Sequence, residues 1–462
     1  MKSVLATLAA SVLMACGGGN KAQPAKPDTT KSDTAQSPPA KPAELYDRLG
    51  GQRAIVAVVD DFIDRVAADS RINLRFFNTD LPRLKTLLVE FVCAATNGPC
   101  KYTGQDMETS HAGMELVSDE FDALVDDLSQ TLDKFKVPAK EKGELLGALG
   151  PLKPAMVVPP NKLQPVSDDK IAKATAVLDK VTDPQAKTFL QGAITAAKRG
   201  QRNYADQLFS RAEMIAGAQV VAPAAIAFRD GAPKRITTEL KQMPKDAAPQ
   251  PNVVGNSDDD DPNQAKQPGS LKGTITVDGK PLDGVGLVML YPESGKYSKR
   301  TPKYRVVEQR NKTFLPHLLA VPPGSTVAFP NYDNVYHNVF STSPTQPFDV
   351  GLYKDGQSRE MKFDRTGLVR LGCNIHAKMA SYIFVIDAPA YVPVEGSKEF
   401  DFKSLAPGKY KAKVWSEKTQ DPAEQEITIK TGENTITFDV KGDAKPGPID
   451  DKFGRSRRDD TK

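Results

Sequence analysis

The sequence predicts a multidomain α + β protein, in which an all-α part precedes an all-β part. Its 462 residues exceed what one hydrophobic core usually serves, so two or three domains are expected. In the first part, apolar residues recur at the three- and four-residue steps of an amphipathic helix: Ile55, Val58, Val59, Phe62, Ile63 and Val66. From Leu271 onward the period changes to two, which is typical of β-strands, in residues 273–277, 285–291 and 325–329.

Residues 1–16 have the features of a signal peptide for export. Lys2 precedes an apolar run over 4–15, which is shorter than the roughly 20 residues that a membrane-spanning helix needs. The run ends in Leu13-Met14-Ala15-Cys16, which resembles a lipobox, the motif whose cysteine becomes the lipid-modified N-terminus of a mature lipoprotein. Cleavage at an ordinary small-residue site is the alternative.

The residues after Cys16 indicate where such a lipoprotein would reside. Residues 17–42 are rich in Lys, Pro, Asp, Thr and Ser, and predict a mobile tether. Because Gly17 and not Asp follows the cysteine, the analogy with bacterial lipoproteins favours the outer membrane, facing the periplasm. Nucleic acid is not an expected partner, since 62 basic and 58 acidic residues leave a formal charge of only +4.

The chain has four cysteines and four histidines, few enough for each to be considered for a role. Cys16 is assigned to the lipid. Cys93 and Cys100 are seven residues apart, so they can close a short loop as a disulfide in an oxidising compartment. Two buried free thiols are the alternative. The fourth, Cys373, belongs to the metal site described below.

Residues 43–157 are predicted to be helical throughout and carry a family resemblance. The segments concerned are Leu45 to Gly51, Phe76-Phe77, Tyr102 to Gly104 and Met107 to His111. They are similar to group 1 truncated haemoglobins. The resemblance implies that His111 is the proximal ligand of a non-covalent haem b. Without it, a lone histidine in a helical domain is more often a structural residue than a ligand.

The same resemblance places Ile63, Leu84 and Leu88 in the distal haem pocket, with Ile63 where the family usually has a tyrosine. Such an apolar pocket offers no hydrogen-bond donor to iron-bound oxygen, so nitric oxide is the favoured diatomic ligand. Since no second histidine exists in this domain, bis-histidine ligation is excluded. A five-coordinate iron and a weak sixth ligand, such as water or methionine, both stay open.

Two segments between the halves predict no chemistry. Residues 168–220 are Ala-rich and predict a helical hairpin that acts as a spacer. Their part over 189–216 resembles one tetratricopeptide unit, but a single unit could not bury its own face. Residues 241–270 predict a disordered linker, and the acidic run over 258–261 lacks the spacing and the glycine of a calcium loop.

Four side chains of the β part have the composition of a mononuclear copper site: His337, Cys373, His376 and Met379. The two sulfurs suit Cu(I) and the imidazoles also accept Cu(II), whereas zinc rarely takes methionine. Type 1 sites place one histidine on an early strand and the other ligands on a single loop. The loop length resembles that of amicyanin among the blue copper proteins, and implies a cupredoxin over residues 296–388 with type 1 copper. A redox-inert core cysteine is the alternative.

The flanks of the cupredoxin segment predict a second β-sandwich. Residues 405–410 look like the closing half of a carboxypeptidase-regulatory-like, or transthyretin-like, domain. Residues 271–295 and 389–441 are therefore expected to form this small sandwich, with the cupredoxin inserted into it. The last segment, 442–462, is charged and contains Pro and Gly, and predicts a disordered tail.

One further histidine, His317, recurs in position in the plastocyanin-like and methylamine-utilisation-like proteins that this half resembles. Because the four-ligand set is already full, an exposed or outer-sphere position is preferred over ligation.

Together these predictions indicate an electron-transfer protein that is anchored to the membrane by lipid and has periplasmic redox proteins as partners. Copper would carry single electrons, and the linker would keep the two centres at high effective concentration. An oxidoreductase acting on nitric oxide, oxygen or peroxide, with the cupredoxin as its electron donor, is one alternative. A gas or redox sensor, or a copper-binding store, is the other.

Overall fold

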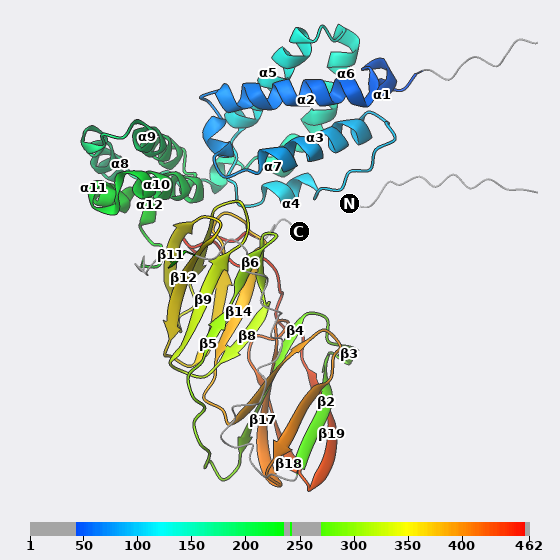
Figure 1. The fold of residues 1–462 in the computed structure, drawn as a ribbon, viewed down its shortest axis with the longest axis vertical. Helices are drawn as coiled ribbons and strands as arrows, with labels where there is room; N and C mark the ends of the chain where they lie inside the picture. Colours follow the sequence, from blue (N-terminus) through cyan, green and yellow to red (C-terminus); the bar gives the residue numbers. More distant parts are fainter. Residues whose placement is uncertain (1–42, 235–240, 243–268, 458–462) are drawn as a thin grey trace, which may run out of the picture. The chain divides into compact units, whose positions relative to one another are not determined.

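The computed structural model describes residues 43–234, 241–242 and 269–457 of the chain. Figure 1 shows helices in the first part and β-sandwiches in the second, which confirms the predicted multidomain α + β class. Within these described ranges, no helix has both the length and the apolar character needed to cross a bilayer. The predicted signal peptide, the lipidation site Cys16 and the tether over 17–42 lie outside them.

The first helical region follows the amphipathic pattern of its sequence. Its helices are α1 (Leu45–Arg48), α2 (Gly51–Ala68), α3 (Leu81–Ala95), α4 (Met107–His111), α5 (Ser118–Lys134), α6 (Ala139–Leu149) and α7 (Lys153–Met156), with a 3₁₀ turn at Asn73–Phe76. Helix α2 buries Ile55, Val59 and Ile63 in a core that also contains Cys93 of α3 and Ala123 of α5. The three- and four-residue spacing thus points one face of α2 at both neighbouring helices.

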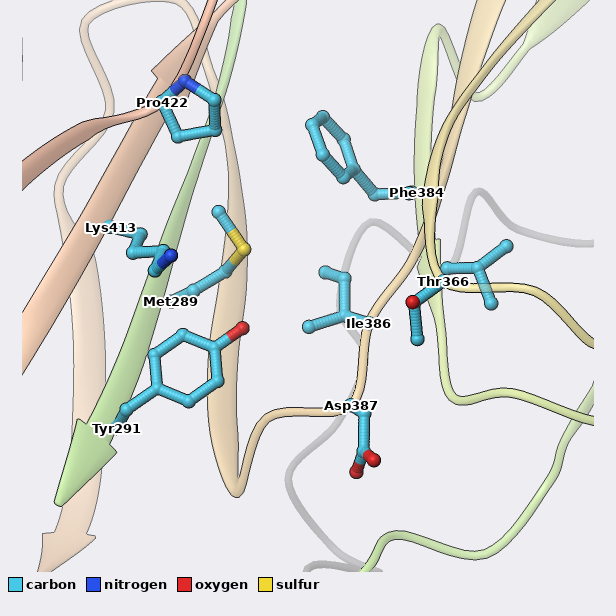
Figure 2. Close-up of a pocket in the computed structure, with 10 residues that line it drawn as sticks. Met289, Tyr291, Thr366, Phe384, Ile386, Asp387, Lys413 and Pro422 are labelled. Atoms are coloured by element: carbon cyan, nitrogen blue, oxygen red, sulfur yellow. The ribbon is translucent and has the colours of Figure 1, made fainter. Parts of the chain in front are cut away.

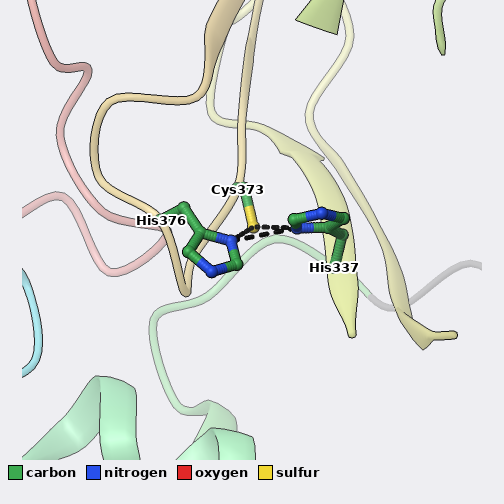
Figure 3. A group of neighbouring side chains, drawn as sticks. All are labelled: His337, Cys373 and His376. Atoms are coloured by element: carbon green, nitrogen blue, oxygen red, sulfur yellow. Dashed lines mark hydrogen bonds between the residues drawn. The ribbon is translucent and has the colours of Figure 1, made fainter. Parts of the chain in front are cut away.

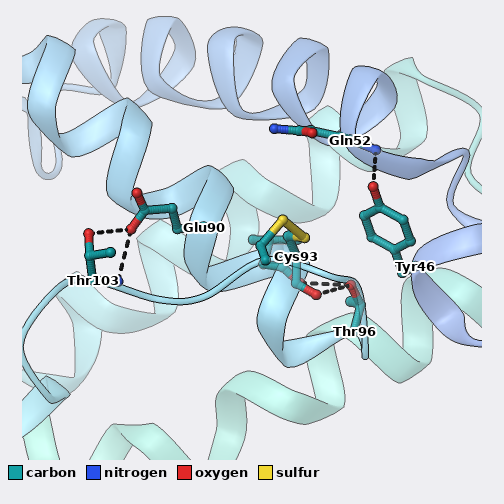
Figure 4. Close-up of a disulfide and its surroundings, with 8 residues drawn as sticks. Tyr46, Gln52, Glu90, Cys93, Thr96 and Thr103 are labelled. Carbon is teal, nitrogen blue, oxygen red and sulfur yellow. Dashed lines mark hydrogen bonds between the residues drawn. A yellow bond between two sulfur atoms is a disulfide. The ribbon is translucent and has the colours of Figure 1, made fainter.

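A disulfide closes the loop after α3 (Figure 4). Cys93, near the end of α3, is bonded to Cys100 with a Cα–Cα distance of 5.7 Å. The loop between them is also held by a hydrogen bond from the Gly98 N–H to the Cys93 carbonyl. This loop leads to α4, so the disulfide restrains the chain segment that precedes His111.

The second helical region is larger than the predicted hairpin. It consists of α8 (Asp168–Thr175), α9 (Pro184–Lys198), α10 (Arg202–Ala216), α11 (Ala218–Val221) and α12 (Ala225–Arg229). Helices α9 and α10 pack together, and α8 and α12 cover them, so that Leu190, Leu208 and Phe209 are fully buried. The predicted hairpin corresponds to α9 and α10, and α8 lies within the predicted helical range of 168–220. The short helices α8, α11 and α12 pack against this hairpin and complete its core, which the prediction of a hairpin alone did not include.

The small β-sandwich is made from two separated stretches of chain. One sheet has the order β15-β4-β17-β18 and the other β16-β2-β19, with β3 paired to β2. The strands are β2 (Gly269–Val277), β3 (Lys280–Pro281), β4 (Val285–Pro292), β15 (Ala390–Glu395), β16 (Phe400–Leu405), β17 (Gly408–Ser416), β18 (Ala423–Ile429) and β19 (Gly432–Val440). Their inward side chains form one core, in which the rings of Phe400 and Phe438 stack.

Apart from β1, which precedes β2, the strands of the inserted sandwich lie between β4 and β15 in the chain. Its sheets have the orders β1-β12-β9-β6-β7, with β5 on β9, and β11-β10-β13-β14-β8. The strands are β1 (Lys241–Gln242), β5 (Tyr304–Val306), β6 (Glu308–Arg310), β7 (Thr313–Leu315), β8 (Leu318–Val321), β9 (Ser325–Asn331), β10 (His337–Ser341), β11 (Phe348–Tyr353), β12 (Gln357–Phe363), β13 (Gly367–Gly372) and β14 (Ala380–Val385). Strands β8 and β14 run parallel, and the other pairings of this second sheet are antiparallel.

The two sandwiches share a hydrophobic cluster. Trp415 of the small sandwich is 2% exposed and packs edge-on against Tyr382 and Phe384 of the inserted one, with ring centroids 5.2 and 5.0 Å apart. Leu287 of β4 and Ala320 of β8 belong to the same cluster. Because this buried apolar cluster contains side chains of both sandwiches, it favours a fixed orientation of one sandwich relative to the other.

Two predictions of disorder are wrong where the structure describes the chain. Lys241 and Gln242, at the start of the predicted linker, form β1 against β12, while 243–268 lie outside the described residues. In the predicted tail, Ile449, Asp451 and Lys452 are buried. The charged composition of this segment predicted exposure to solvent. The prediction failed because the side chains that pair with Asp451 and Lys452 lie far away in the sequence. Residues 458–462 lie outside the described part of the chain.

Candidate metal centre and haem site

Strand pairing explains why distant residues meet at the candidate metal centre. His337 is the first residue of β10, and β13 ends at Gly372, immediately before Cys373. The two strands are antiparallel neighbours, with Phe340 opposite Gly372. The start of β10 and the loop that follows β13 therefore lie at the same end of the sheet.

Three of the four predicted copper ligands converge there, as Figure 3 shows. The Cys373 Sγ lies 3.9 Å from the His337 Nδ1 and 3.8 Å from the His376 Nδ1. The two Nδ1 atoms are 3.0 Å apart. Among the His, Cys, Asp and Glu side chains of the described residues, these three form a group whose ligand atoms lie close enough to share one ion. Both histidines present the same ring nitrogen to the thiol, which leaves each Nε2 atom for another partner.

The fourth predicted ligand, Met379, is held in the same loop. Its carbonyl accepts a hydrogen bond from the Cys373 N–H at 3.2 Å, and its N–H donates to the His376 carbonyl at 3.0 Å. The Asn374 N–H donates to the Asn338 Oδ1 at 2.6 Å, which ties the loop to β10. Met379 is 1% exposed and packs in the same core cluster as Cys373.

Burial and close partners give these groups unusual acidities. Burial alone would raise the pKa of the Cys373 thiol, but the hydrogen bonds and positive charge of the two imidazoles hold it well below its usual value. For His337, burial lowers the pKa and the hydrogen bonds to Asp333 and Cys373 outweigh it, raising the pKa to about 9. Burial lowers the pKa of His376. In the metal-free protein these groups therefore favour a thiolate beside a His337 imidazolium.

A carboxylate that the spacing of the ligands did not reveal completes the site. Asp333 Oδ2 accepts a hydrogen bond from His337 Nε2 at 2.8 Å. Its carboxylate also accepts from the Asn311 N–H at 2.6 Å and from the Lys312 N–H at 2.8 Å. These bonds fix the ring and direct its Nδ1 atom toward Cys373. In the sequence, the only sign of this partner is that Asp333 lies four residues before His337. That spacing identifies a carboxylate partner only once the fold of the segment between the two residues is known.

The structure places His317 away from this group. Its Nε2 pairs with Glu417 Oε2 at 3.1 Å, and its ring packs edge-on against Tyr382. Glu417 also accepts a hydrogen bond from the Val285 N–H. His317 therefore belongs to the junction of the two sandwiches and not to the metal centre.

His111 occupies the last residue of α4. Its Nδ1 donates to the Met107 carbonyl at 2.8 Å, and burial lowers its pKa. The ring is therefore favoured in its neutral form, with Nε2 as the free acceptor. A neutral imidazole whose orientation is fixed by a backbone carbonyl is the form that binds haem iron.

The predicted distal residues lie in the core of the same region. Ile63 is 2% exposed on α2, whereas Leu84 and Leu88 of α3 are only partly buried beside that core. Phe76, Leu124 and Leu128 are partly buried in the same way. Apolar side chains left incompletely covered inside a helical region fit a site that accepts a flat apolar group such as a haem.

A separate pocket of about 290 Å³ lies where the small sandwich meets the inserted one (Figure 2). Met289, Tyr291 and Lys413 line one side, and Phe384 and Asp387 line the other. Its lining contains neither cysteine nor histidine. This pocket is therefore not the site of the predicted redox chemistry.

Comparison with known proteins identifies the first helical region. The profile of the family described as "Bacterial-like globin" matches residues 44–158. The group 1 truncated haemoglobin of Mycolicibacterium paratuberculosis is 40% identical over 115 residues, which cover 85% of that protein and 25% of this chain. That of Tetrahymena pyriformis is 36% identical over 97 residues, which cover 80% of that protein and 21% of this chain. Through this segment, the chain belongs to the group 1 truncated haemoglobins.

Solved structures resemble two parts of the chain. Truncated haemoglobin of Tetrahymena pyriformis in the Fe(III) form covers 25% of this chain, at 30% identity and a TM-score of 0.25, and all of that protein is matched. A mutant of amicyanin in the Cu(I) form covers 18%, at 21% identity and a TM-score of 0.17, with 82% of that protein matched. A purple cupredoxin from Nitrosopumilus maritimus also covers 18%, at 22% identity and a TM-score of 0.17, with 99% of it matched.

Proposed function

We propose that this protein is an electron-transfer protein that combines a haem-binding truncated globin with a type 1 copper centre. The observation that carries the proposal is the convergence of Cys373 Sγ with the Nδ1 atoms of His337 and His376, all within 4.8 Å of one another. One thiolate and two imidazoles suit copper, which would supply a one-electron redox couple.

The residues around this set perform the tasks that such a centre needs. Cys373 and His337 are fully buried, which excludes water, and Met379 lies in the same core as a further sulfur ligand. Asp333 fixes the ring of His337. Because burial and hydrogen bonds hold these side chains in place, a change in the charge of the centre would require little rearrangement of the protein.

For the globin, we propose that His111 binds the iron of a non-covalent haem b. Family membership and the hydrogen bond from His111 Nδ1 to the Met107 carbonyl support this assignment. The apolar side chains of Ile63, Leu84 and Leu88 would cover the other face of the haem. They offer no hydrogen bond to a bound diatomic gas, which favours nitric oxide over oxygen as a ligand.

The proposed location is the periplasmic face of the outer membrane, with a lipid on Cys16 as the anchor and periplasmic redox proteins as partners. The disulfide between Cys93 and Cys100 supports an oxidising compartment. Labelling of cells with a radioactive fatty acid tests the anchor, because a Cys16→Ser variant should lose the label.

The optical spectrum of the full chain, supplied with copper and haem, tests the proposed function. We expect a haem Soret band and an intense thiolate-to-copper band that disappears on reduction and returns on reoxidation. Cys373→Ser should abolish the second band alone, whereas the matched variant His317→Ala should keep both. If no thiolate-to-copper band appears with Cu(II), the copper assignment is refuted. Steady turnover of nitric oxide or peroxide would instead support the alternative function of an oxidoreductase.

A further inference from the structure

The loop that carries the copper ligands contacts the turn that follows His111. Gly113 lies two residues after His111, with a φ angle of 74°. A Cβ atom placed on Gly113 would lie 3.5 Å from the Cβ of Ala377, an ordinary van der Waals distance. Ala377 directly follows His376 and is 4% exposed. The two segments that carry the metal-binding histidines therefore meet through small residues.

A hydrogen bond lies on the other side of His111. Lys378 Nζ donates to the Thr109 Oγ1 at 3.1 Å. Thr109 belongs to α4, and its N–H is held by the Asp106 carboxylate at 2.7 Å, which caps the helix. The contact thus includes residues on both sides of His111, and consecutive residues of the copper loop.

The C-terminal segment Ile449–Arg457, which we call the C-terminal clasp, contacts the same loop and turn, and its residues Ile449, Asp451 and Lys452 are buried. The Arg457 guanidinium donates to the Cys373 carbonyl at 2.8 Å and to the Asn374 Oδ1 at 2.8 Å. Its Nε atom would lie 4.0 Å from a Cβ on Gly113. One side chain therefore touches both the backbone of the copper loop and the turn after His111.

A second arginine of the clasp extends this connection into the globin. Arg455 Nη2 lies 2.5 Å from Glu115 Oε1, and Glu115 is two residues beyond Gly113. Glu115 is 7% exposed and also accepts a hydrogen bond from the Tyr204 N–H of α10. Since both charges are shielded from water, this ion pair is more strongly coupled than a surface pair.

We propose that the contact of Ala377 and Lys378 with Gly113 and Thr109 is an electron-transfer contact, across which the copper centre and the haem exchange electrons within one chain. This inference rests on the proposed function. In the step, one metal is oxidised by one electron and the other is reduced by one electron, and no atom or proton changes place. Two centres joined by such a contact react at a high effective concentration.

The contact itself can be tested without either cofactor. The first test uses the full-length chain with Cys373→Ser, which removes the free thiol of the copper loop. In this background, Gly113→Cys with Ala377→Cys should form a disulfide. The two Cβ atoms would lie 3.5 Å apart, and disulfides need a Cβ–Cβ distance of about 3.5–4.5 Å. Peptide mass mapping identifies the bond. The control pair Gly113→Cys with Lys362→Cys should stay reduced. Because cysteine at a positive φ could disturb folding, Thr109→Cys with Lys378→Cys and a short bismaleimide provide a second pair.

Kinetics of the full chain loaded with copper and haem test the transfer. After a substoichiometric pulse of photoreduced flavin, the thiolate-to-copper and haem bands should equilibrate in a first-order phase that is independent of protein concentration. Lys378→Ala, at an exposed contact with Thr109, should slow this phase and leave both spectra unchanged. Lys362→Ala, which removes an exposed lysine outside the contact, should not slow it.

The outcomes separate this inference from the function on which it rests. A missing thiolate-to-copper or Soret band refutes the proposed function. If both bands are present and the equilibration rate rises in proportion to protein concentration, transfer occurs between molecules, and the intramolecular contact is refuted while the function stands. Failure of both cysteine pairs to cross-link in folded protein also overturns the contact.

Discussion

At the proposed copper centre, Asp333 is a residue outside the ligand set that would control both the orientation and the charge of the site. Its carboxylate holds the Nε2 atom of His337 and is itself held by the Asn311 and Lys312 N–H groups. The negative charge of this carboxylate, which contacts the proposed ligand His337, would favour the more positive oxidation state of a bound copper ion. Orientation and charge thus come from the same side chain.

Asp333→Asn should therefore weaken copper binding by about 10- to 100-fold, the usual cost of losing such an outer partner. It should also raise the reduction potential, since Cu(I) is favoured when the carboxylate charge is removed. Competitive metal titration and spectroelectrochemistry measure the two effects. Asp355→Asn, an exposed aspartate of the same sandwich, serves as the control. An unchanged potential would show that Asp333 does not act on the centre.

The acidities of the ligands predict a proton release on metal binding. Because the pKa of His337 is raised to about 9, its ring carries a proton near neutral pH, whereas the Cys373 thiol with its lowered pKa has already lost one. Copper needs a neutral imidazole, so binding near pH 7 should release about one proton, and the release should vanish as the pH rises through the His337 pKa. Calorimetry in buffers of different ionisation enthalpy measures this number, and zero release near pH 7 would contradict the assignment.

At the scale of elements, the loop after α3 depends on the bond between Cys93 and Cys100. The bond closes a loop with a sequence separation of 7. Removing it by Cys93→Ser with Cys100→Ser should lower the free energy of unfolding of the globin by about 2–3 kcal/mol, because the unfolded chain regains conformational entropy. Denaturation followed at the Soret band measures the loss. Cys373→Ser, which leaves the disulfide intact, should not change the midpoint of that transition.

The elements also show what sequence could predict. The helix over 51–68 and the strands around the copper ligands were evident because their apolar period is a local property. The loop over 373–379 was evident for the same reason, since its ligands lie within seven residues. Helix α12, which lies beyond the predicted helical range of 168–220, was not predicted, because a short Ala-rich segment is stable only when it covers other helices.

At the scale of the whole described chain, buried charges connect regions that are far apart in sequence. The Lys452 ammonium, whose side chain is fully buried, is paired with Asp349 at 2.9 Å and also with Asp206 of α10. The Asn203 Nδ2 donates to Asp451 Oδ2 at 2.8 Å. The composition of residues 442–462 suggested disorder, because a local sequence pattern cannot indicate ion-pair partners that lie more than a hundred residues away.

Lys452→Met should destabilise the protein strongly, because it leaves Asp206 and Asp349 buried without their shared cation. The loss of one partner of such a buried group costs about 3–5 kcal/mol. Thermal unfolding of the full chain, followed by calorimetry, measures the effect. Lys445→Met, at an exposed position of the same segment, should behave as the wild type. Equal melting temperatures for the two variants would show that the clasp contributes no stability.

X-ray absorption spectroscopy of the full chain loaded with copper tests the ligand set most directly. The account predicts one sulfur at short distance and two imidazole nitrogens around the metal, with the short-distance sulfur contribution lost in Cys373→Ser and one nitrogen lost in His337→Ala. A copper environment of nitrogen and oxygen alone in the wild type, or one that neither substitution alters, would contradict it.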